Sequence, residues 1–327
     1  KKILILANSQ LTIESFLIPL IKKLKKKYKI VIISKFFSKK NFLLKDIETY
    51  NLDLKREIKI LDDLKNLLKI NKFIKKNNFD LIFTITPKSG LLGMLSGFFN
   101  KTKVRIHIFT GQVWANKSSF FKYFLKFFDK LIIYLSTDIL CDGINQKKFL
   151  LQNGFKENIK VIENGSICGV DIKKFKPDNK IKKKYRKKFK IKKNEIVFVY
   201  AGRISKDKGI DSLKKVFLLL KKSKYKIHFF LLGNDETNYF KKSIKDIKNL
   251  HHINHSEHLN EFFQFADVYI TSTYREGFGI SVAQAMSSNL PVIAPNIYGL
   301  KDILKNNVNS LIYNIDDIKK LYSCCVI

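Results

Sequence analysis

The sequence contains few cysteines, and their positions exclude the usual structural uses of this residue. Only Cys141, Cys168, Cys324 and Cys325 occur among 327 residues. They lack the ligand spacing that zinc sites need, and the adjacent pair at the end is a poor framework for disulfide bonds. We therefore expect reduced thiols and no metal site built on cysteine.

Long hydrophobic runs are also absent. No segment approaches the ~18–20 uninterrupted apolar residues that a membrane-spanning helix needs. The first residues, Lys1–Ser9, predict a short strand, and no apolar secretory segment with a cleavage site follows it. The sequence therefore predicts a cytoplasmic protein.

Acidic residues are scarce, with 28 Asp and Glu against 63 Lys and Arg and a formal net charge of +35. Almost all of the positive charge is lysine, spread along the whole chain as a biased base composition of the coding sequence would produce. Five residues are arginine: Arg56, Arg105, Arg186, Arg203 and Arg275. No zinc finger, RNA-recognition signature or basic-region helix accompanies the charge, so specific binding of nucleic acid is not expected. An anionic inner membrane surface is a better partner, since each nearby lysine contributes ~1 kcal/mol.

Strand-like and helix-like hydrophobic patterns alternate in both halves of the chain. In the first half, the strands are predicted at 3–7, 30–33, 81–86 and 103–109, and the helices at 17–24, 61–76 and 91–99. In the second half, the strands are predicted at 196–201, 226–232, 251–254, 267–272 and 290–294, and the helices at 210–222, 236–247, 258–265, 280–288 and 299–305. This pattern indicates an α/β fold with parallel sheets covered on both faces, whose ligands bind at the carboxyl ends of the strands.

A lysine-rich stretch separates the two halves. Residues 173–194 have few large apolar side chains, which predicts a basic linker, with room for a short helix, between domains 1–172 and 195–327. After the first strand the chain reads Asn8-Ser9-Gln10-Leu11-Thr12, a loop without glycine.

The segment Ser272–Leu300 is the most informative part of the chain. A predicted strand leads into Glu276-Gly277-Phe278-Gly279, and an amphipathic helix starts near Ile280. Glycines at such a turn let the backbone approach a ligand, and the main-chain N–H groups of Gly279, Ile280 and Ser281 would face an anion. Turn chemistry alone is equally compatible with an ordinary surface turn and a solvated Glu276.

This segment resembles the donor site of family-4 glycosyltransferases, because Glu276-Gly-Phe-Gly is followed one helix later by Asn289-Leu-Pro-Val-Ile-Ala. The resemblance implies a retaining, metal-independent enzyme with two Rossmann-like doubly wound parallel-sheet domains facing across a cleft, the GT-B fold. It makes Glu276 a candidate catalytic residue and assigns it, with Gly277 and Phe278, to the transferred sugar. The family's second glutamate, which binds the ribose, is replaced here by Gln284, which loses about half the strength of a charge-assisted hydrogen bond.

Two further motifs extend the resemblance. The segment Ile196–Ile210, a strand followed by Gly202-Arg203 and a polar loop, is similar to the start of the family's C-terminal domain. There an arginine and a lysine bind the donor diphosphate, which places those roles on Arg203 and Lys208. The segment Glu163–Pro177 resembles the connection that leaves the N-terminal domain.

In the first half, Thr86–Gly93 and His107–Gln112 are most similar to the branch that extends lipid-diphosphate-linked oligosaccharides in capsule, O-antigen and glycan-carrier synthesis. By resemblance, His107 is a candidate catalytic residue facing the sugar, and Gly111 and Gln112 line the acceptor side. A histidine within a strand is more often a core residue, so that alternative stays open.

The resemblance implies transfer of a hexose or N-acetylhexosamine from a nucleotide-sugar, with UDP expected, to a lipid-linked or polysaccharide acceptor, without a cofactor. Two alternatives remain. Gln284 and an apolar C-terminal end unlike a surface helix, which suggests truncation, would fit an impaired copy of the enzyme. The lysine content would fit a non-enzymatic protein that binds membranes or polyanions.

Two local patterns each allow two interpretations. Residues 120–130 place aromatic side chains and lysines at helical spacing, which fits a helix in the membrane interface at the inner face of the plasma membrane or a core helix of a Phe-rich protein. The histidines at 251, 252, 255 and 258 suggest a metal site, but they fall on a strand and a loop without a completing ligand set, so structural roles are favoured.

Overall fold

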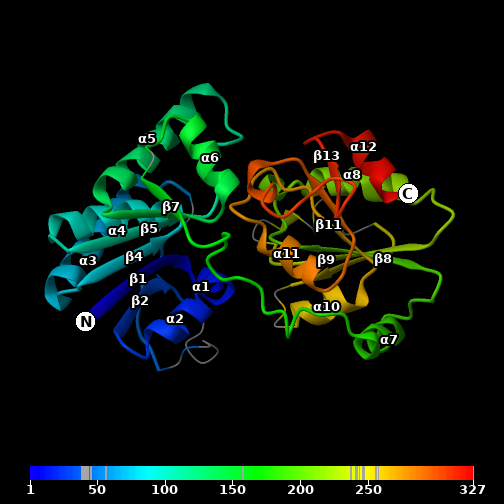
Figure 1. Cartoon of the computed structure of the whole chain (residues 1–327), viewed down its shortest axis with the longest axis horizontal. Helices are drawn as coiled ribbons and strands as arrows, with labels where there is room; N and C mark the ends of the chain where they lie inside the picture. Colours follow the sequence, from blue (N-terminus) through cyan, green and yellow to red (C-terminus); the bar gives the residue numbers. More distant parts are fainter. Residues whose placement is uncertain are drawn as a thin grey trace. The chain divides into compact units, whose positions relative to one another are not determined.

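The computed structural model describes residues 1–37, 44, 46–55, 57–156, 158–235, 238–239, 242, 244, 247–254, 256 and 258–326. It divides into two compact units, Lys1–Cys168 and Gly169–Ile327. Each unit is a parallel sheet with helices on both faces (Figure 1). The predicted helix at 236–247 falls mostly on residues outside this description, as does His255.

The first unit contains, in its described part, a seven-stranded parallel sheet in the order β3-β2-β1-β4-β5-β6-β7. Its strands are β1 (Lys2–Ser9), β2 (Lys29–Lys35), β3 (Glu48–Asn51), β4 (Leu81–Ile85), β5 (Val104–Phe109), β6 (Asp138–Cys141) and β7 (Ile159–Val161). Its helices are α1 (Gln10–Phe16), α2 (Ile18–Leu24), α3 (Ile60–Asn77), α4 (Pro87–Phe99), α5 (Ser119–Leu135) and α6 (Ile144–Gln152).

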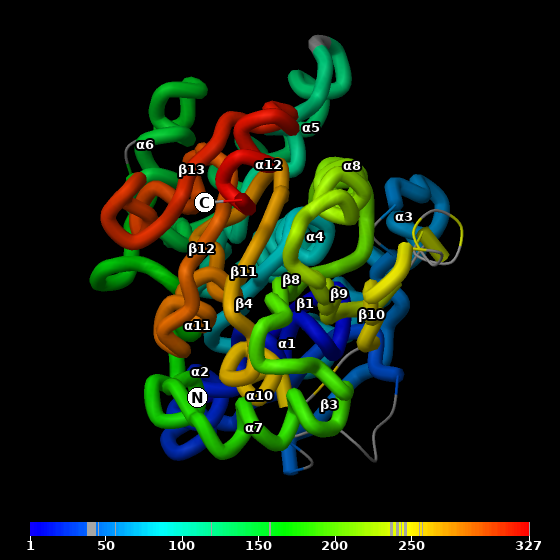
Figure 2. The backbone as a smooth tube through the Cα atoms, turned by 90° about the vertical axis from the view of Figure 1, so that its right-hand side faces the viewer, coloured from blue at the N-terminus to red at the C-terminus, as the bar shows by residue number. Residues whose placement is uncertain are grey.

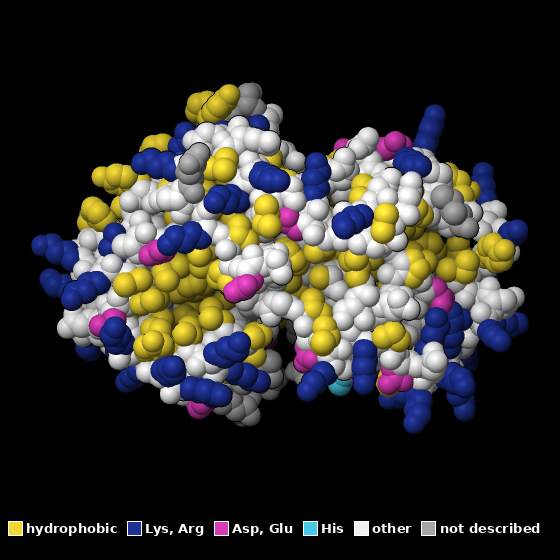
Figure 3. All heavy atoms as spheres, in the orientation of Figure 1, with side chains coloured by type: hydrophobic (Ala, Val, Ile, Leu, Met, Phe, Trp, Pro, Cys, Tyr) yellow, Lys and Arg dark blue, Asp and Glu magenta, His cyan; other side chains and the backbone are white. Residues whose placement is uncertain are grey.

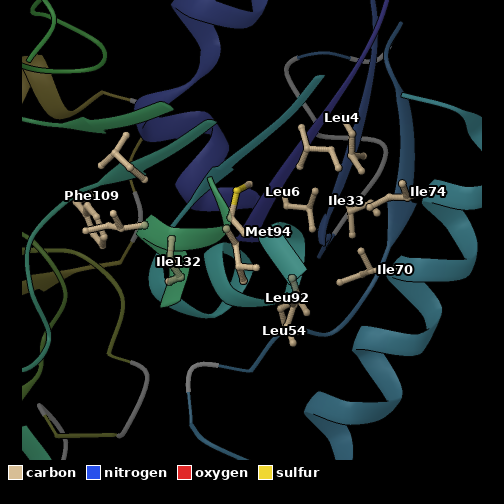
Figure 4. Packing of buried hydrophobic residues seen from close by; sticks show 14 of the residues in the cluster. Leu4, Leu6, Ile33, Leu54, Ile70, Ile74, Leu92, Met94, Phe109 and Ile132 are labelled. Atoms are coloured by element: carbon tan, nitrogen blue, oxygen red, sulfur yellow. The ribbon is translucent and has the colours of Figure 1, made fainter. Parts of the chain in front are cut away.

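Alternation along β1 explains how this unit forms two cores. Ile3, Ile5 and Ala7 pack on the side of α1 and α2, while Leu4 and Leu6 pack on the side of α3, α4 and α5. Successive strand side chains point to opposite faces, so a continuous apolar strand is buried on both. Figure 4 shows the second of these cores, and burial of each such side chain contributes ~1.5–3 kcal/mol.

The second unit contains, over the residues described, a six-stranded parallel sheet in the order β10-β9-β8-β11-β12-β13 (Figure 2). Its strands are β8 (Ile196–Ala201), β9 (Ile227–Leu232), β10 (Leu250–Ile253), β11 (Val268–Ile270), β12 (Val292–Pro295) and β13 (Leu311–Tyr313). Its helices are α7 (Asn179–Lys188), α8 (Ile210–Leu220), α10 (Leu259–Phe265), α11 (Ile280–Ser287) and α12 (Ile318–Cys325), with 3-10 turns η1 (Lys206–Lys208) and η2 (Tyr298–Leu300).

The stretch 173–194, predicted as a linker, folds as part of the second unit. Asp178 caps α7 by accepting hydrogen bonds from the N–H groups of Lys180 and Ile181. Tyr185 of α7 is buried against Phe262 of α10, with ring centroids 5.3 Å apart. The few apolar side chains of this stretch are therefore enough to anchor it, and the division between the units lies before it, at Cys168–Gly169.

Three other local predictions differ from the structure. The predicted loop after β1 is the start of α1, whose first turn is capped by Ser9. The predicted helix at 299–305 is reduced to the 3-10 turn η2. The end of the chain is an ordinary amphipathic surface helix, because α12 buries Leu321 and Cys324 against the core that contains α8.

Candidate donor site and family membership

The candidate site lies where the strand order of the second sheet reverses. β8 has β9 on one side and β11 on the other, so the connections after β8 and β11 leave the sheet in opposite directions (Figure 2). Ligands of doubly wound sheets bind in the crevice that such a reversal opens at the carboxyl ends of the strands. The segments that follow these two strands are Gly202–Gly209 and Thr271–Gly279, the ones that carry the predicted site residues.

The two segments are in direct backbone contact. Gly209 has φ +70°, and a Cβ built there would lie 1.9 Å from the carbonyl oxygen of Ser272. The Ser272 hydroxyl donates to the carbonyl oxygen of Gly209 over 2.6 Å. A residue with a side chain would force the segments apart, so this glycine permits the contact that brings the two sets of charged residues together.

Paired charges join the segments beyond that contact. Lys208 Nζ lies 2.6 Å from Glu276 Oε1. Asp207 Oδ2 lies 2.8 Å from Arg203 Nη2 and 3.3 Å from Arg275 Nη2. The predicted diphosphate ligands, Arg203 and Lys208, and the predicted sugar ligand, Glu276, thus belong to one network of charges.

Asp207 remains ionised within this network. Burial alone would raise the pKa of its carboxyl group, but the charges of Arg203 and Arg275 and a hydrogen bond from the Ser205 hydroxyl hold the pKa well below its usual range. The carboxylate is therefore a fixed negative charge between two guanidinium groups at neutral pH.

Two buried tyrosines fix the surrounding backbone. Tyr200 of β8 donates from its hydroxyl to the carbonyl oxygen of Arg203 over 2.8 Å. Tyr269 of β11 donates to the Ser281 hydroxyl, 2.9 Å away, and so ties the first turn of α11 to the sheet. Burial raises the pKa of both phenols above their usual value, so both stay neutral hydrogen-bond donors.

The turn at Gly277, Phe278 and Gly279 leads into α11 as predicted, with Gly279 at φ +84° as the residue before the helix. The first N–H groups of a helix have no acceptor within the helix, which suits an anion. Gln284 lies in the second turn of α11 and is half-buried. Gly202 directly follows β8.

Sequence analysis did not assign Asp207, Ser272, Tyr269 or Arg275 to the site. Arg275 could have been assigned from the sequence, because arginine is rare in this chain and this one adjoins Glu276. The contacts that join the two segments, Asp207 with Arg275 and Ser272 with Gly209, link residues 68 and 63 positions apart along the chain, and no local pattern encodes such pairs.

Known families and relatives match the chain over both units. The family model described as "Glycosyl transferases group 1" matches residues 181–322, and the one described as "Glycosyl transferase 4-like" matches residues 2–134. The capsular polysaccharide biosynthesis glycosyltransferase CapM of Staphylococcus aureus is 30% identical over 281 residues, covering 83% of this chain and 72% of that protein.

The chain belongs to the group 1 glycosyltransferases.

Two further relatives bear on this glycosyltransferase. The UDP-Gal:alpha-D-GlcNAc-diphosphoundecaprenol alpha-1,3-galactosyltransferase of Escherichia coli is 23% identical over 287 residues, covering 83% of this chain and 72% of that protein. The structure of HepE from Anabaena in complex with UDP and glucose aligns with a TM-score of 0.77 at 17% identity, covering 98% of this chain and 88% of that one. At that identity the likeness concerns the fold, which is GT-B.

In the first unit of the glycosyltransferase, His107 is a core residue. It lies on β5, is 1% exposed, and shares a 2.7 Å hydrogen bond between its Nδ1 and the Thr84 hydroxyl. A Cβ on Gly90 of α4 would lie 2.5 Å from its ring, so α4 packs directly over it. Burial lowers the pKa of His107 to about 3. Such a side chain does not reach a substrate, which argues against the catalytic role that the resemblance assigned to it.

The predicted acceptor residues follow the same strand. Gly111 has φ +108° in the turn after β5. Gln112 is buried, and its Oε1 accepts a hydrogen bond of 3.3 Å from Gln146 of α6. These residues therefore shape the loop between β5 and α5.

A polar cluster that sequence analysis missed lies at the reversal of strand order in the first sheet, between β1 and β4. The Thr86 hydroxyl donates to Asn8 Oδ1 over 2.6 Å and lies 2.9 Å from the Ser89 hydroxyl. Thr86 has φ +82°, a conformation that a β-branched residue rarely adopts. Strain of this kind clusters at functional sites, which makes Thr86 a candidate substrate contact of the first unit.

The histidines near 251 have separate environments in the part of the chain that is described. His251 stacks on Phe230 with ring centroids 4.4 Å apart, and His252 Nε2 lies 2.8 Å from the carbonyl oxygen of Gly233. His258 pairs with Glu261. No group of three His, Cys, Asp or Glu residues that could hold a metal ion occurs among the described residues.

The helix expected at 120–130 is α5, and its aromatic side chains are largely exposed. Phe120 is 84%, Tyr123 69% and Phe127 60% exposed, and lysines are interspersed with them. Figure 3 shows hydrophobic side chains interspersed with Lys and Arg side chains over the visible surface. Within the described residues, no helix is both long and apolar enough to cross a bilayer.

Proposed function

We propose that this glycosyltransferase is a retaining, metal-independent enzyme that moves a hexose or N-acetylhexosamine from a UDP-sugar to a lipid-linked saccharide. The observation that carries the proposal is the contact of the two strand-end segments, which joins the segment of the cations Arg203 and Lys208 to that of Glu276 at the reversal of the second sheet. A diphosphate is the part of a nucleotide-sugar that needs such a cluster of cations.

Each residue predicted for the donor site has a role in this proposal. Arg203 and Lys208 bind the diphosphate, together with the main-chain N–H groups of Gly279, Ile280 and Ser281. These groups stabilise the negative charge that develops on the leaving diphosphate as the glycosidic bond breaks, a task for which the protein needs no metal ion. The carboxylate of Glu276 accepts hydrogen bonds from hydroxyl groups of the transferred sugar. Gln284 accepts one from the ribose, and Gly202, Gly277 and Phe278 line the donor.

The acceptor class rests on the relatives. The galactosyltransferase of Escherichia coli is named for a diphosphoundecaprenol-linked acceptor, and the relative from Staphylococcus aureus is named for capsular polysaccharide synthesis. We place the acceptor saccharide on the first unit, at Thr86 and Gly111, because these residues follow the carboxyl ends of β4 and β5, while the buried Gln112 supports the loop through its hydrogen bond with Gln146.

Isothermal titration of UDP tests the donor site. Removal of the Arg203 guanidinium should weaken UDP binding about 30-fold, because hydrogen bonds between charged groups contribute ~1.5–3 kcal/mol. Lys206→Ala is the matched control, since Lys206 is an exposed cation three residues along the same segment. Equal affinities of wild type, Arg203→Ala and Lys206→Ala would refute the proposed donor site.

Two product assays test the finer claims. Nuclear magnetic resonance of the product should show the anomeric configuration of the donor retained, and UDP release with a polyprenyl-diphosphate-linked acceptor should persist in excess EDTA. An inverted product would contradict retention, and complete loss of turnover in EDTA, restored by a divalent cation, would contradict metal independence.

We also propose that the enzyme associates with anionic membranes through α5. The support is chemical: exposed aromatic rings suit the interface of a bilayer, and lysines on the same helix suit its anionic headgroups. Sedimentation with vesicles containing phosphatidylglycerol should fall several-fold in Phe120→Ser/Phe127→Ser. Tyr225→Ser, which removes a half-exposed aromatic ring from the other unit, should leave it unchanged. Equal loss in both variants would contradict a role specific to α5.

A further inference from the structure

Arg275 is a charged residue of the donor site without an assigned role. It directly precedes Glu276, and its Nη2 lies 3.3 Å from Asp207 Oδ2. The Thr273 hydroxyl donates to the carbonyl oxygen of Arg275 over 2.9 Å, which holds its main chain in the turn after β11. The side chain is 23% exposed, so it is neither buried in the core nor free in solvent.

Arg275 belongs to a ladder of two ion pairs, in which each segment contributes the carboxylate of one pair and the cation of the other. Asp207 and Lys208 are neighbours on one segment, and Arg275 and Glu276 are neighbours on the other. Asp207 pairs with Arg275, and Lys208 pairs with Glu276. With Arg203 on the same Asp207 oxygen, the network holds three cations and two carboxylates. It therefore carries one net positive charge at the place proposed for a diphosphate.

The other described arginines differ from this pair. Arg105 donates to the carbonyl oxygens of Leu135 and Thr102, and Arg186 donates to those of Lys192 and Glu195 and also pairs with the Asp267 carboxylate. Those guanidinium groups hold main-chain segments in place. Arg203 and Arg275, by contrast, converge on one carboxylate oxygen at the reversal of the sheet.

We propose that Arg275 is a second guanidinium ligand of the donor diphosphate and that Asp207 is the positioning residue that holds it beside Arg203. The two guanidinium groups repel each other because both lie close to one oxygen of Asp207. The negative charge of that shared carboxylate offsets the repulsion and fixes the direction of both side chains. The planar fork of each group can then take phosphate oxygens that a single arginine would not reach. Arg275 thereby favours a nucleoside diphosphate over a monophosphate. This inference rests on the proposed donor site.

The test compares UDP with UMP by isothermal titration on the full chain. Arg275→Ala should weaken UDP binding about tenfold and UMP binding less than threefold, because UMP lacks the second phosphate. Arg275→Lys should recover only part of the loss, since lysine keeps the charge but not the fork. Lys206→Ala again controls for general electrostatics, and circular dichroism confirms that each variant is folded.

A double-variant cycle tests the role of Asp207. If Asp207 positions Arg275, then in an Asp207→Asn background the change Arg275→Ala should cost less than threefold in UDP affinity. A full tenfold cost in that background would overturn the positioning role. If Arg275→Ala matches Lys206→Ala while Arg203→Ala still weakens UDP, the role of Arg275 is wrong and the donor site stands. If Arg203→Ala is also without effect, the proposed function itself fails.

Discussion

The two sheets of this glycosyltransferase reverse their strand order in the same way but carry different chemistry at that point. In the second unit, three cations and two carboxylates follow β8 and β11. In the first unit, the neutral side chains of Asn8, Thr86 and Ser89 are joined by hydrogen bonds at the ends of β1 and β4, and the nearby cation Lys88 is paired with Asp63 of α3. The comparison teaches that the fold sets where a ligand can bind, while the side chains set its class: the charged groups suit the proposed diphosphate in one unit, and the neutral groups suit the proposed saccharide hydroxyls in the other.

The largest expected effect comes from a substitution that disrupts the backbone contact of the donor site. Gly209→Ala places a Cβ against the carbonyl oxygen of Ser272 and should destabilise the second unit by about 2–4 kcal/mol and abolish UDP binding. Urea denaturation followed by circular dichroism measures the loss. Gly169→Ala is the matched control: its φ is +63°, but nothing lies within 4 Å of its Cβ, so the cost should be about 1 kcal/mol. Similar losses in both variants would show that the close contact is unimportant.

The second prediction concerns acidity inside the first unit. Burial raises the pKa of Asp129 to about 7 and lowers that of His107 to about 3. Between about pH 4.5 and 6, the unfolded chain releases a proton that folded Asp129 keeps, so this group lowers stability as pH rises. Over the same range, the unfolded chain binds a proton that folded His107 does not, so His107 raises stability as pH rises.

In the wild type, the effects of Asp129 and His107 on stability therefore change with pH in opposite directions. Asp129→Asn should remove the effect of Asp129. Relative to the wild type, the stability of the variant should then increase with pH by up to about 2 kcal/mol between about pH 4.5 and 6. The amide oxygen introduced at position 129 can still accept the hydrogen bond from Trp114, the single tryptophan of the chain, whose fluorescence reports unfolding of this unit. Parallel pH profiles of the two proteins would contradict the opposing roles.

A third prediction separates the two sites by function. Thr86→Val removes the hydroxyl that contacts Asn8 and keeps the shape of the side chain. The rate of sugar transfer to the acceptor should fall about tenfold, because the lost hydrogen bond contributes about 1 kcal/mol and the side-chain oxygen of Asn8 loses its donor. The affinity for UDP should stay within about twofold of wild type. A parallel loss of UDP affinity would show that the two sites are not distinct in function.

The smallest expected effect concerns how tightly the donor site binds the ribose of the nucleotide. Gln284→Glu restores a carboxylate for the ribose hydroxyls and should tighten UDP binding about threefold, since a charge-assisted bond is roughly twice as strong as a neutral one. Binding of inorganic pyrophosphate should not improve, because it has no ribose. An unchanged affinity for UDP would indicate that the glutamine is a functional substitute rather than a sign of impairment.

Much of the fold could be predicted from hydrophobic patterns, because strands buried on both faces read as continuous apolar runs. β1, β4, β8 and β9 were recognisable for that reason. β3 (Glu48–Asn51) was not, since it is a short edge strand in which Tyr50 alone packs against the core. The sequence allowed for a short helix where α7 lies, but its many lysines concealed that a few apolar side chains suffice to dock this helix on the second unit.

The site was predictable only as far as its motifs are local. Arg203, Lys208 and Glu276 could be assigned roles as hypotheses because each lies in a short segment that resembles a motif of the family. The bridging role of Asp207 and the strained backbone of Thr86 arise from contacts between residues far apart in sequence, which no local pattern encodes. For His107, the sequence left both alternatives open, and burial beneath α4 decides for the core residue.

The ion-pair ladder has a consequence for how a nucleotide would arrive. Because folding already fixes the direction of these long, flexible side chains, little of their rotational freedom is left to lose when a ligand binds. Preorganisation of this kind predicts rapid association that slows as salt is added, with a binding heat dominated by exchange of electrostatic partners rather than by ordering of loops.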